Sequence, residues 1–157
     1  MTIESLALTK PPVVTTDMLI RRPAAEVYEA FADPAMTTRF WFTKSSGRLE
    51  PGARVRWDWE MFDLHTYVTV KEAQAGRRLL VEWNPDQPST VEFTFTPEGD
   101  EATHVVITES ELEGTGDEIV AYLVGSTGGF TKILCAAKAL LEHGIALNVV
   151  ADHKMTS

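Results

Sequence analysis

Apolar and polar residues alternate through the middle of the chain. Residues 53–61 are the clearest case, because Val55, Trp57, Trp59 and Met61 share one parity and charged residues occupy most of the other positions. Side chains of a strand point to its two faces in turn, so this run predicts a strand with an aromatic inner face. Pro, Gly and Asp turns separate similar runs, which predicts a series of strands at 44–50, 53–61, 64–74, 78–84, 89–97 and 102–112.

The region before these strands contains a first strand and short helices. Residues 13–21 are rich in β-branched side chains and predict a strand. Pro23 suits the first turn of a helix, which should end before Asp33-Pro34 because a residue that precedes proline avoids the helical conformation. Residues 35–42 are expected to form a second short helix or turn.

The last part of the chain has the spacing of one long amphipathic helix. His143-Gly144 provides a suitable end for it, since glycine accommodates the left-handed cap. Glycine is unfavourable inside a helix by about 1 kcal/mol relative to alanine. The cluster Gly125, Gly128 and Gly129 therefore predicts a kink or a split between Ser126 and Gly129. The predicted apolar stripe consists of Ile119, Leu123, Phe130, Ile133, Leu134, Ala137, Leu140 and Leu141.

The order of elements predicts an α+β fold. A curved antiparallel sheet with one apolar face needs a cover, and only the C-terminal helix is long enough to supply it. In this arrangement the sheet wraps around the helix and leaves space between them. We expect a flexible leader at residues 1–12, one domain at 13–150 and a tail at 151–157.

Composition restricts the partners of the chain. A formal net charge of −9 disfavours nucleic acid and anionic membranes, which bind clustered Lys and Arg. Cys135 is the only cysteine, which fits a reducing cytoplasm, and no signal peptide or uninterrupted apolar run of about 20 residues is evident. The four histidines form no cluster with carboxylates or cysteines, so we predict neither a metal site nor a cofactor. A cytoplasmic protein is expected.

Five segments carry a resemblance to known proteins, namely residues 20–34, Arg39-Phe40-Trp41-Phe42, residues 78–83, Gly129-Phe130 and residues 141–148. They resemble the START-like superfamily, also called Bet v 1-like or SRPBCC, and within it the family named after activators of the heat-shock protein 90 ATPase (AHSA1-like). Arg39-Phe40-Trp41-Phe42 is similar to the tryptophan-pair motif of that family, with Phe40 where tryptophan is commoner. Gly129-Phe130 stands where a Gly-Trp pair often opens the last helix. The resemblance covers roughly residues 13–150.

The resemblance implies a helix-grip fold with a cavity. Members of the superfamily bind lipids, hormones or polyketides, and some are cyclases or hydrolases. The family's eukaryotic co-chaperones carry an additional N-terminal domain that this sequence lacks, so chaperone contact is not expected. A homodimer formed through exposed apolar residues or the N-terminal leader is a further expectation.

Candidate ligand contacts come from the predicted inner faces of the sheet and the last helix. Tryptophan is large and carries an N–H that needs a partner when buried, so several on one wall favour a hydrated pocket, although core packing explains them equally well. The hydroxyl groups of Tyr122, Ser126 and Thr127 lie near the glycine cluster, where they could face a ligand or simply be exposed. Cys135 is expected to be buried and inert. The candidates are Trp57, Trp59, Trp83, Phe93, Phe95, Glu109, Tyr122, Ser126, Phe130 and Leu134.

Glu109 is the candidate with the most distinctive chemistry. It follows Val105 and Ile107 in the same register, which places it on the inner face, and it replaces a histidine that is common in the family. A carboxylate beside an apolar pocket is costly unless it is paired, and such a group can anchor a ligand or act as a general acid or base. The alternative is a hydrated structural residue at the end of the sheet.

Three functions remain open from sequence. The first is binding of a small hydrophobic or aromatic molecule between the sheet and the last helix, with Glu109 as polar anchor. The second is a cyclase or hydrolase that uses Glu109 as acid or base. The third is a protein-interaction module with an exposed apolar patch formed by Phe40, Trp41, Phe42 and Phe62.

Overall fold

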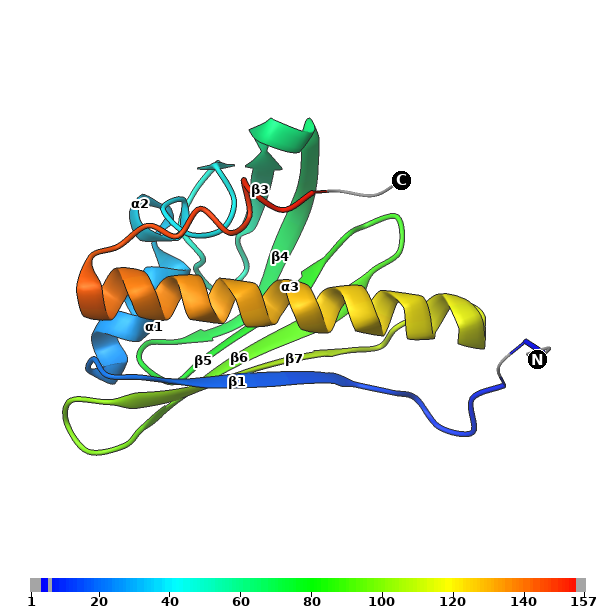
Figure 1. Cartoon of the computed structure of the whole chain (residues 1–157), viewed down its shortest axis with the longest axis horizontal. Helices are drawn as coiled ribbons and strands as arrows, with labels where there is room; N and C mark the ends of the chain where they lie inside the picture. Colours follow the sequence, from blue (N-terminus) through cyan, green and yellow to red (C-terminus); the bar gives the residue numbers. More distant parts are fainter. Residues whose placement is uncertain (1–3, 6, 155–157) are drawn as a thin grey trace.

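One antiparallel sheet of seven strands forms the body of the protein (Figure 1). The structure, a computed structural model, describes residues 4–5 and 7–154. The strand order is β1-β7-β6-β5-β4-β3-β2, so consecutive strands from β2 to β7 are neighbours and β1 pairs with β7 at the other edge. The strands are β1 Val14–Ile20, β2 Lys44–Ser45, β3 Arg54–Trp59, β4 Leu64–Gln74, β5 Arg78–Trp83, β6 Ser89–Pro97 and β7 Thr103–Ser110.

Two short helices follow β1, as the sequence predicts. Helix α1 covers Ala24–Ala32 and α2 covers Pro34–Thr37. Asp33 separates them with an extended backbone, and its side chain accepts a hydrogen bond from the backbone N–H of Ala35. Asp33-Pro34 therefore ends one helix and caps the next.

Helix α3, Gly116–His143, lies across the sheet and covers its inner face (Figure 1). Thr115 and Glu118 form a reciprocal capping box at its start, and Gly144 ends it with φ of 67°. The predicted kink or split at Ser126–Gly129 is wrong, because α3 is continuous. Packing against the sheet supplies most of the stability of such a helix and outweighs the low propensity of its glycines.

The inner faces of the strands supply the hydrophobic core. Trp57 is 1% exposed and stacks on Phe42, with ring centroids 4.3 Å apart and planes 20° apart. Phe40 and Trp41 are also buried and Phe62 is half-buried, so the exposed patch predicted at Phe40, Trp41, Phe42 and Phe62 is wrong. Phe42 and Trp41 pack against Trp57 instead.

Three other local expectations are wrong. The strand predicted at 44–50 is reduced to Lys44–Ser45. Met61 does not continue the inner face of β3, because Glu60–Phe62 form a 3-10 turn, η1, that leaves Met61 40% exposed. Cys135 lies on the outer side of α3 and is exposed.

Helix α3 is also long and apolar enough to cross a membrane, judged by length and composition alone. Its most apolar window has a mean hydropathy of 1.4, and 22% of that window is buried in the protein. A core helix of a folded domain passes the same test, and α3 packs against β1. Length and hydropathy therefore do not distinguish a membrane-spanning helix from a core helix here.

The glycines of α3 lead to a stability prediction. A Cβ atom placed on Gly128 would meet no heavy atom within 4 Å. Gly128→Ala should therefore raise the free energy of unfolding by about 0.5–1 kcal/mol, since alanine loses less backbone entropy in a helix. Urea denaturation followed by circular dichroism measures this change. A loss of stability would mean that the helix needs a glycine at this position.

Candidate functional site

A buried carboxylate lies between the end of the sheet and α3. Glu109 is 0% exposed, on the same face of β7 as Val105 and Ile107, as its register predicts. Its Oε2 accepts hydrogen bonds from Trp83 Nε1 at 2.9 Å, from Tyr122 Oη at 2.7 Å and from the hydroxyl of Ser89. Its Oε1 accepts one from Ser126 Oγ at 2.5 Å. We call these five residues the Glu109 cluster.

Three neighbouring strands and α3 bring the Glu109 cluster together. Trp83 ends β5 and pairs with Ser89, which begins β6. Glu109 is near the end of β7 and pairs with Val91 of β6. Tyr122 and Ser126 are four residues apart on α3, so they project from the same face of that helix. The cluster therefore connects the sheet to its covering helix.

The donors offset the cost of burying a carboxylate. An ionised carboxylate only accepts hydrogen bonds, and the Glu109 cluster supplies four. Burial raises the pKa of Tyr122, and its hydrogen bond to Glu109 raises it further. The Tyr122 hydroxyl thus keeps its proton at neutral pH and remains a donor to Glu109.

An open groove runs beside the cluster, with a volume of about 460 Å³. Aromatic side chains from the sheet end form one wall, α3 forms a second and the segment after α3 forms a third. Figure 1 shows this segment turning back between α3 and the β3–β4 hairpin. We call this space the aromatic groove. Its lining is Trp41, Trp59, Phe62, Trp83, Tyr122, Val124, Gly125, Ser126, Gly128, Gly129, Phe130, Lys132, Ile133, Val149, Val150 and His153.

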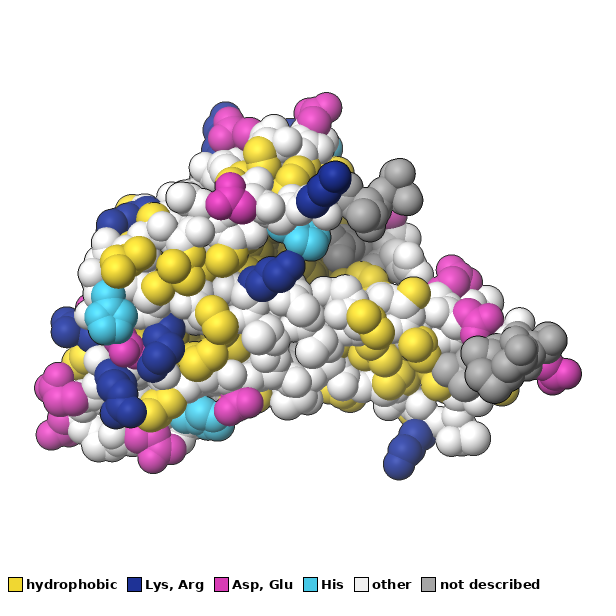
Figure 2. All heavy atoms as spheres, in the orientation of Figure 1, with side chains coloured by type: hydrophobic (Ala, Val, Ile, Leu, Met, Phe, Trp, Pro, Cys, Tyr) yellow, Lys and Arg dark blue, Asp and Glu magenta, His cyan; other side chains and the backbone are white. Residues whose placement is uncertain are grey.

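Glycines shape the helical wall of the aromatic groove. Gly125, Gly128 and Gly129 all line it, and a Cβ atom on any of them would meet nothing within 4 Å. Figure 2 shows the corresponding stretch of α3 as a white strip between apolar surfaces. Larger side chains here would project into the groove rather than into the core.

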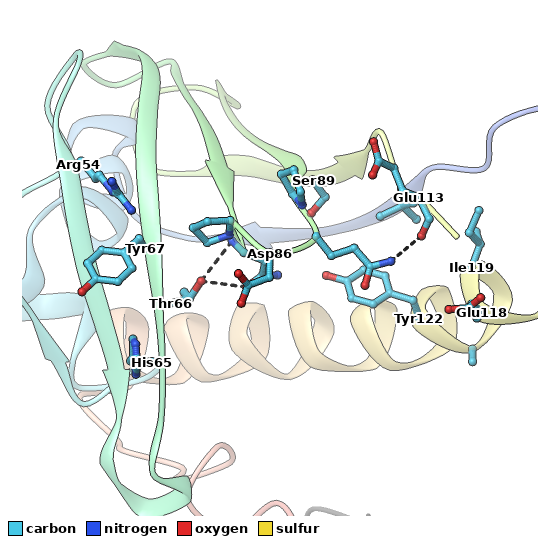
Figure 3. A pocket seen from close by; sticks show the side chains of 16 residues that line it. Arg54, His65, Thr66, Tyr67, Asp86, Ser89, Glu113, Glu118, Ile119 and Tyr122 are labelled. Carbon is cyan, nitrogen blue, oxygen red and sulfur yellow. Dashed lines mark hydrogen bonds between the residues drawn. The ribbon is translucent and has the colours of Figure 1, made fainter. Parts of the chain in front are cut away.

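A second, more polar cleft of about 810 Å³ also has Tyr122 in its lining (Figure 3). It is bounded by the β3–β4 hairpin, the β5–β6 loop and the first turns of α3. The Gln87 side chain donates to the carbonyl oxygen of Glu113 at 2.8 Å, and the guanidinium of Arg54 lies 4.7 Å from the centre of the Tyr67 ring. Tyr122 lines both spaces, Ser89 lines the polar cleft, and Trp83 and Ser126 line the aromatic groove.

The structure brings half of the predicted site residues to the groove. Trp59, Trp83, Tyr122, Ser126 and Phe130 line it, and Glu109 lies directly behind its donors. The other four candidates are at most 2% exposed and line neither space, namely Trp57, Phe93, Phe95 and Leu134. Strand parity identifies the inner face but not which part of that face the helix covers.

Other lining residues were not singled out from sequence. Ser89 could have been found, because it shares the inward parity of Val91 and Phe93. Val149 and Val150 form an apolar pair after the helix, which was a weak signal. His153 was assigned to the tail, yet it lines the groove and its Nδ1 lies 2.9 Å from Lys132 Nζ. In residues 4–5 and 7–154, no group of three or more His, Cys, Asp or Glu could hold a metal ion.

Comparison with known proteins assigns the chain to a family. Residues 21–142 match the family described as activator of Hsp90 ATPase homolog 1-like protein. The chain belongs to this family. The resemblance of its sequence motifs and the expected helix-grip fold are both confirmed. No curated protein matches the chain.

Solved structures share this fold. Protein SSP2350 from Staphylococcus saprophyticus is 26% identical, with a TM-score of 0.76 over 87% of this chain and 96% of that one. DynU16, from the dynemicin biosynthetic locus, is 25% identical, with a TM-score of 0.69 over 85% of this chain and 48% of that one. Aha1 from Colwellia psychrerythraea, whose solution structure is a dimer, is 15% identical, with a TM-score of 0.72 over 85% of this chain and 98% of that one.

Proposed function

We propose that this AHSA1-like domain binds a small hydrophobic or aromatic molecule in the aromatic groove. The observation that carries the proposal is the combination of an open groove walled by Trp41, Trp59 and Trp83 with a buried polar cluster along the same wall. Its volume of about 460 Å³ falls within the range of small-molecule sites, about 300–1,000 Å³. Such sites combine a mostly apolar lining with a few placed polar groups.

The distribution of tryptophan supports binding rather than simple core packing. Trp57 completes the core, whereas Trp59 and Trp83 are only partly buried and face the groove. Trp83 lies 5.8 Å from Phe130 between ring centroids, which joins the sheet wall to the helix wall. A flat aromatic ligand could extend this arrangement of rings by stacking.

An acid or base role for Glu109 is less well supported. Its carboxylate has no exposed surface, and both oxygens already accept hydrogen bonds. A substrate would reach it only after Ser126 or Tyr122 moved away. A chaperone contact through the predicted patch is also less well supported, because Phe40, Trp41 and Phe42 are at most 6% exposed. A homodimer stays a prediction for this chain, with the dimeric Colwellia relative in its favour.

Blocking the groove tests the proposal. Tryptophan fluorescence is measured while a library of aromatic compounds is titrated into the wild type, Gly128→Leu and Thr127→Leu. We expect saturable quenching in the wild type, a loss of affinity of at least about tenfold in Gly128→Leu because the new side chain enters the groove, and little change in Thr127→Leu, whose position is exposed and outside the groove.

Two results would contradict binding in the groove. One is the absence of saturable binding to the wild type across the library. The other is equal affinity of all three proteins for every compound that binds, because a ligand in the groove must contact the side chain at position 128. Thermal unfolding of both variants confirms that each remains folded during the titration.

A further inference from the structure

The polar end of the aromatic groove has a defined hydrogen-bond polarity. Ser126 lines the groove, and a serine hydroxyl carries a single proton. That proton is donated to Glu109 Oε1 at 2.5 Å. Tyr122 also lines the groove, and its only hydroxyl proton is donated to Glu109 Oε2 at 2.7 Å. Neither hydroxyl therefore has a proton left for a ligand, and Ser126 offers a ligand only lone pairs.

Trp83, the third member of the Glu109 cluster that lines the groove, also uses its hydrogen-bond donor within the cluster. The single N–H of Trp83 points to Ser89 Oγ at 3.0 Å and to Glu109 Oε2 at 2.9 Å. Ser89 in turn donates its proton to Glu109. None of the four hydrogens of the Glu109 cluster is available to a ligand, because a buried carboxylate with no donor of its own accepts all of them.

We propose that this end of the groove selects a ligand that donates a hydrogen bond, namely an aromatic molecule with a phenol, alcohol or amine group. This inference rests on the proposed function and adds the chemistry of the ligand's polar end. A donor completes the lone pairs of Ser126 and lies near the carboxylate of Glu109. A ligand with an ether, carbonyl or carboxylate there places lone pairs against lone pairs.

The far end of the groove has the opposite character. Lys132 lines it and lies six residues after Ser126 on α3, which corresponds to about 9 Å along the helix axis. Its ammonium group contacts His153 Nδ1 at 2.9 Å and retains donors for other partners. The groove thus offers hydrogen-bond acceptors at one end and a cation at the other. A ligand with a donor group would therefore bind with that group toward Ser126.

Three naphthalene compounds that differ in one group test this inference. Isothermal titration calorimetry measures the dissociation constants of naphthalene, 2-naphthol and 2-methoxynaphthalene for the wild type. We expect 2-naphthol to bind at least about tenfold more tightly than its methyl ether, because only the phenol supplies the missing proton. A ratio near one would overturn the inference while leaving the proposed function intact. Failure of all three to bind would contradict both.

Glu109→Gln replaces a carboxylate, which only accepts hydrogen bonds, with an amide of similar size that also donates them. The amide of glutamine can donate to Ser126 or Tyr122, which frees a hydroxyl proton to face the groove. We expect the preference for 2-naphthol over the methyl ether to fall to about threefold or less, and the affinity for naphthalene to stay unchanged. Glu111→Gln is the matched control, since Glu111 is exposed and lines neither space. If Glu109→Gln keeps the wild-type preference for 2-naphthol over its methyl ether, the inference is overturned. If that variant unfolds, the ratio of the two dissociation constants for the wild type still tests the inference.

Discussion

Replacement of Glu109 by alanine should lower the free energy of unfolding by about 3 kcal/mol. The substitution leaves the hydroxyl of Ser89, which is 4% exposed, and the N–H of the half-buried Trp83 without their carboxylate partner. Each buried group that loses its partner costs about 1–3 kcal/mol, and the removed side chain also leaves a cavity. Urea denaturation followed by far-ultraviolet circular dichroism measures the change.

Glu98→Ala is the control for the Glu109 experiment. Glu98 is exposed in the β6–β7 turn, so its loss should change the free energy of unfolding by less than about 0.5 kcal/mol. Similar stability of the wild type and Glu109→Ala would show that the four hydrogen bonds to Glu109 add little to the fold. That result would mean that Glu109 serves ligand binding rather than the stability of the fold.

Trp57 and Trp59 should respond to substitution in different ways, although they are two residues apart on β3. Trp57→Ala should lower the free energy of unfolding by about 4 kcal/mol, since Trp57 is 1% exposed and packs against Phe42 and Trp41. Trp59→Ala should cost about 1–2 kcal/mol, because this side chain is half-buried, but it should weaken ligand binding at least about tenfold.

Stability and binding are measured on the same two variants. Denaturation followed by circular dichroism gives the stability, and calorimetric titration with 2-naphthol gives the affinity. The assignment of Trp59 to the groove fails if its loss leaves the affinity unchanged. Equal destabilisation by the two substitutions would mean that Trp59 belongs to the core as fully as Trp57.

The sequence was sufficient for the fold because local patterns agreed along the chain. Alternation predicted β4, β5 and β6 almost to the residue, and Asp33-Pro34 predicted the break between α1 and α2. The continuity of α3 could not be predicted in the same way. Glycine propensity is a local property, whereas the packing and capping that keep this helix intact depend on the whole domain.

The candidate site was only partly predictable for a related reason. Parity placed Glu109 and Trp57 on the inner face correctly, but it could not show that Trp41 and Phe42 pack over Trp57 while Trp59 stays at the groove. The partners of Glu109 come from β5, β6 and α3, up to 26 residues away in sequence. His153 reaches the groove only because the chain turns back after Gly144.

The most direct test of the account observes the indole N–H signals of the four tryptophans by nuclear magnetic resonance during titration with 2-naphthol. Substitution of each tryptophan assigns its signal. We predict saturable shifts of Trp59 and Trp83, which line the groove, with a much smaller shift of the core residue Trp57. Saturable binding that leaves Trp59 and Trp83 unmoved, or no saturable shift of any indole, would contradict a ligand site in the aromatic groove.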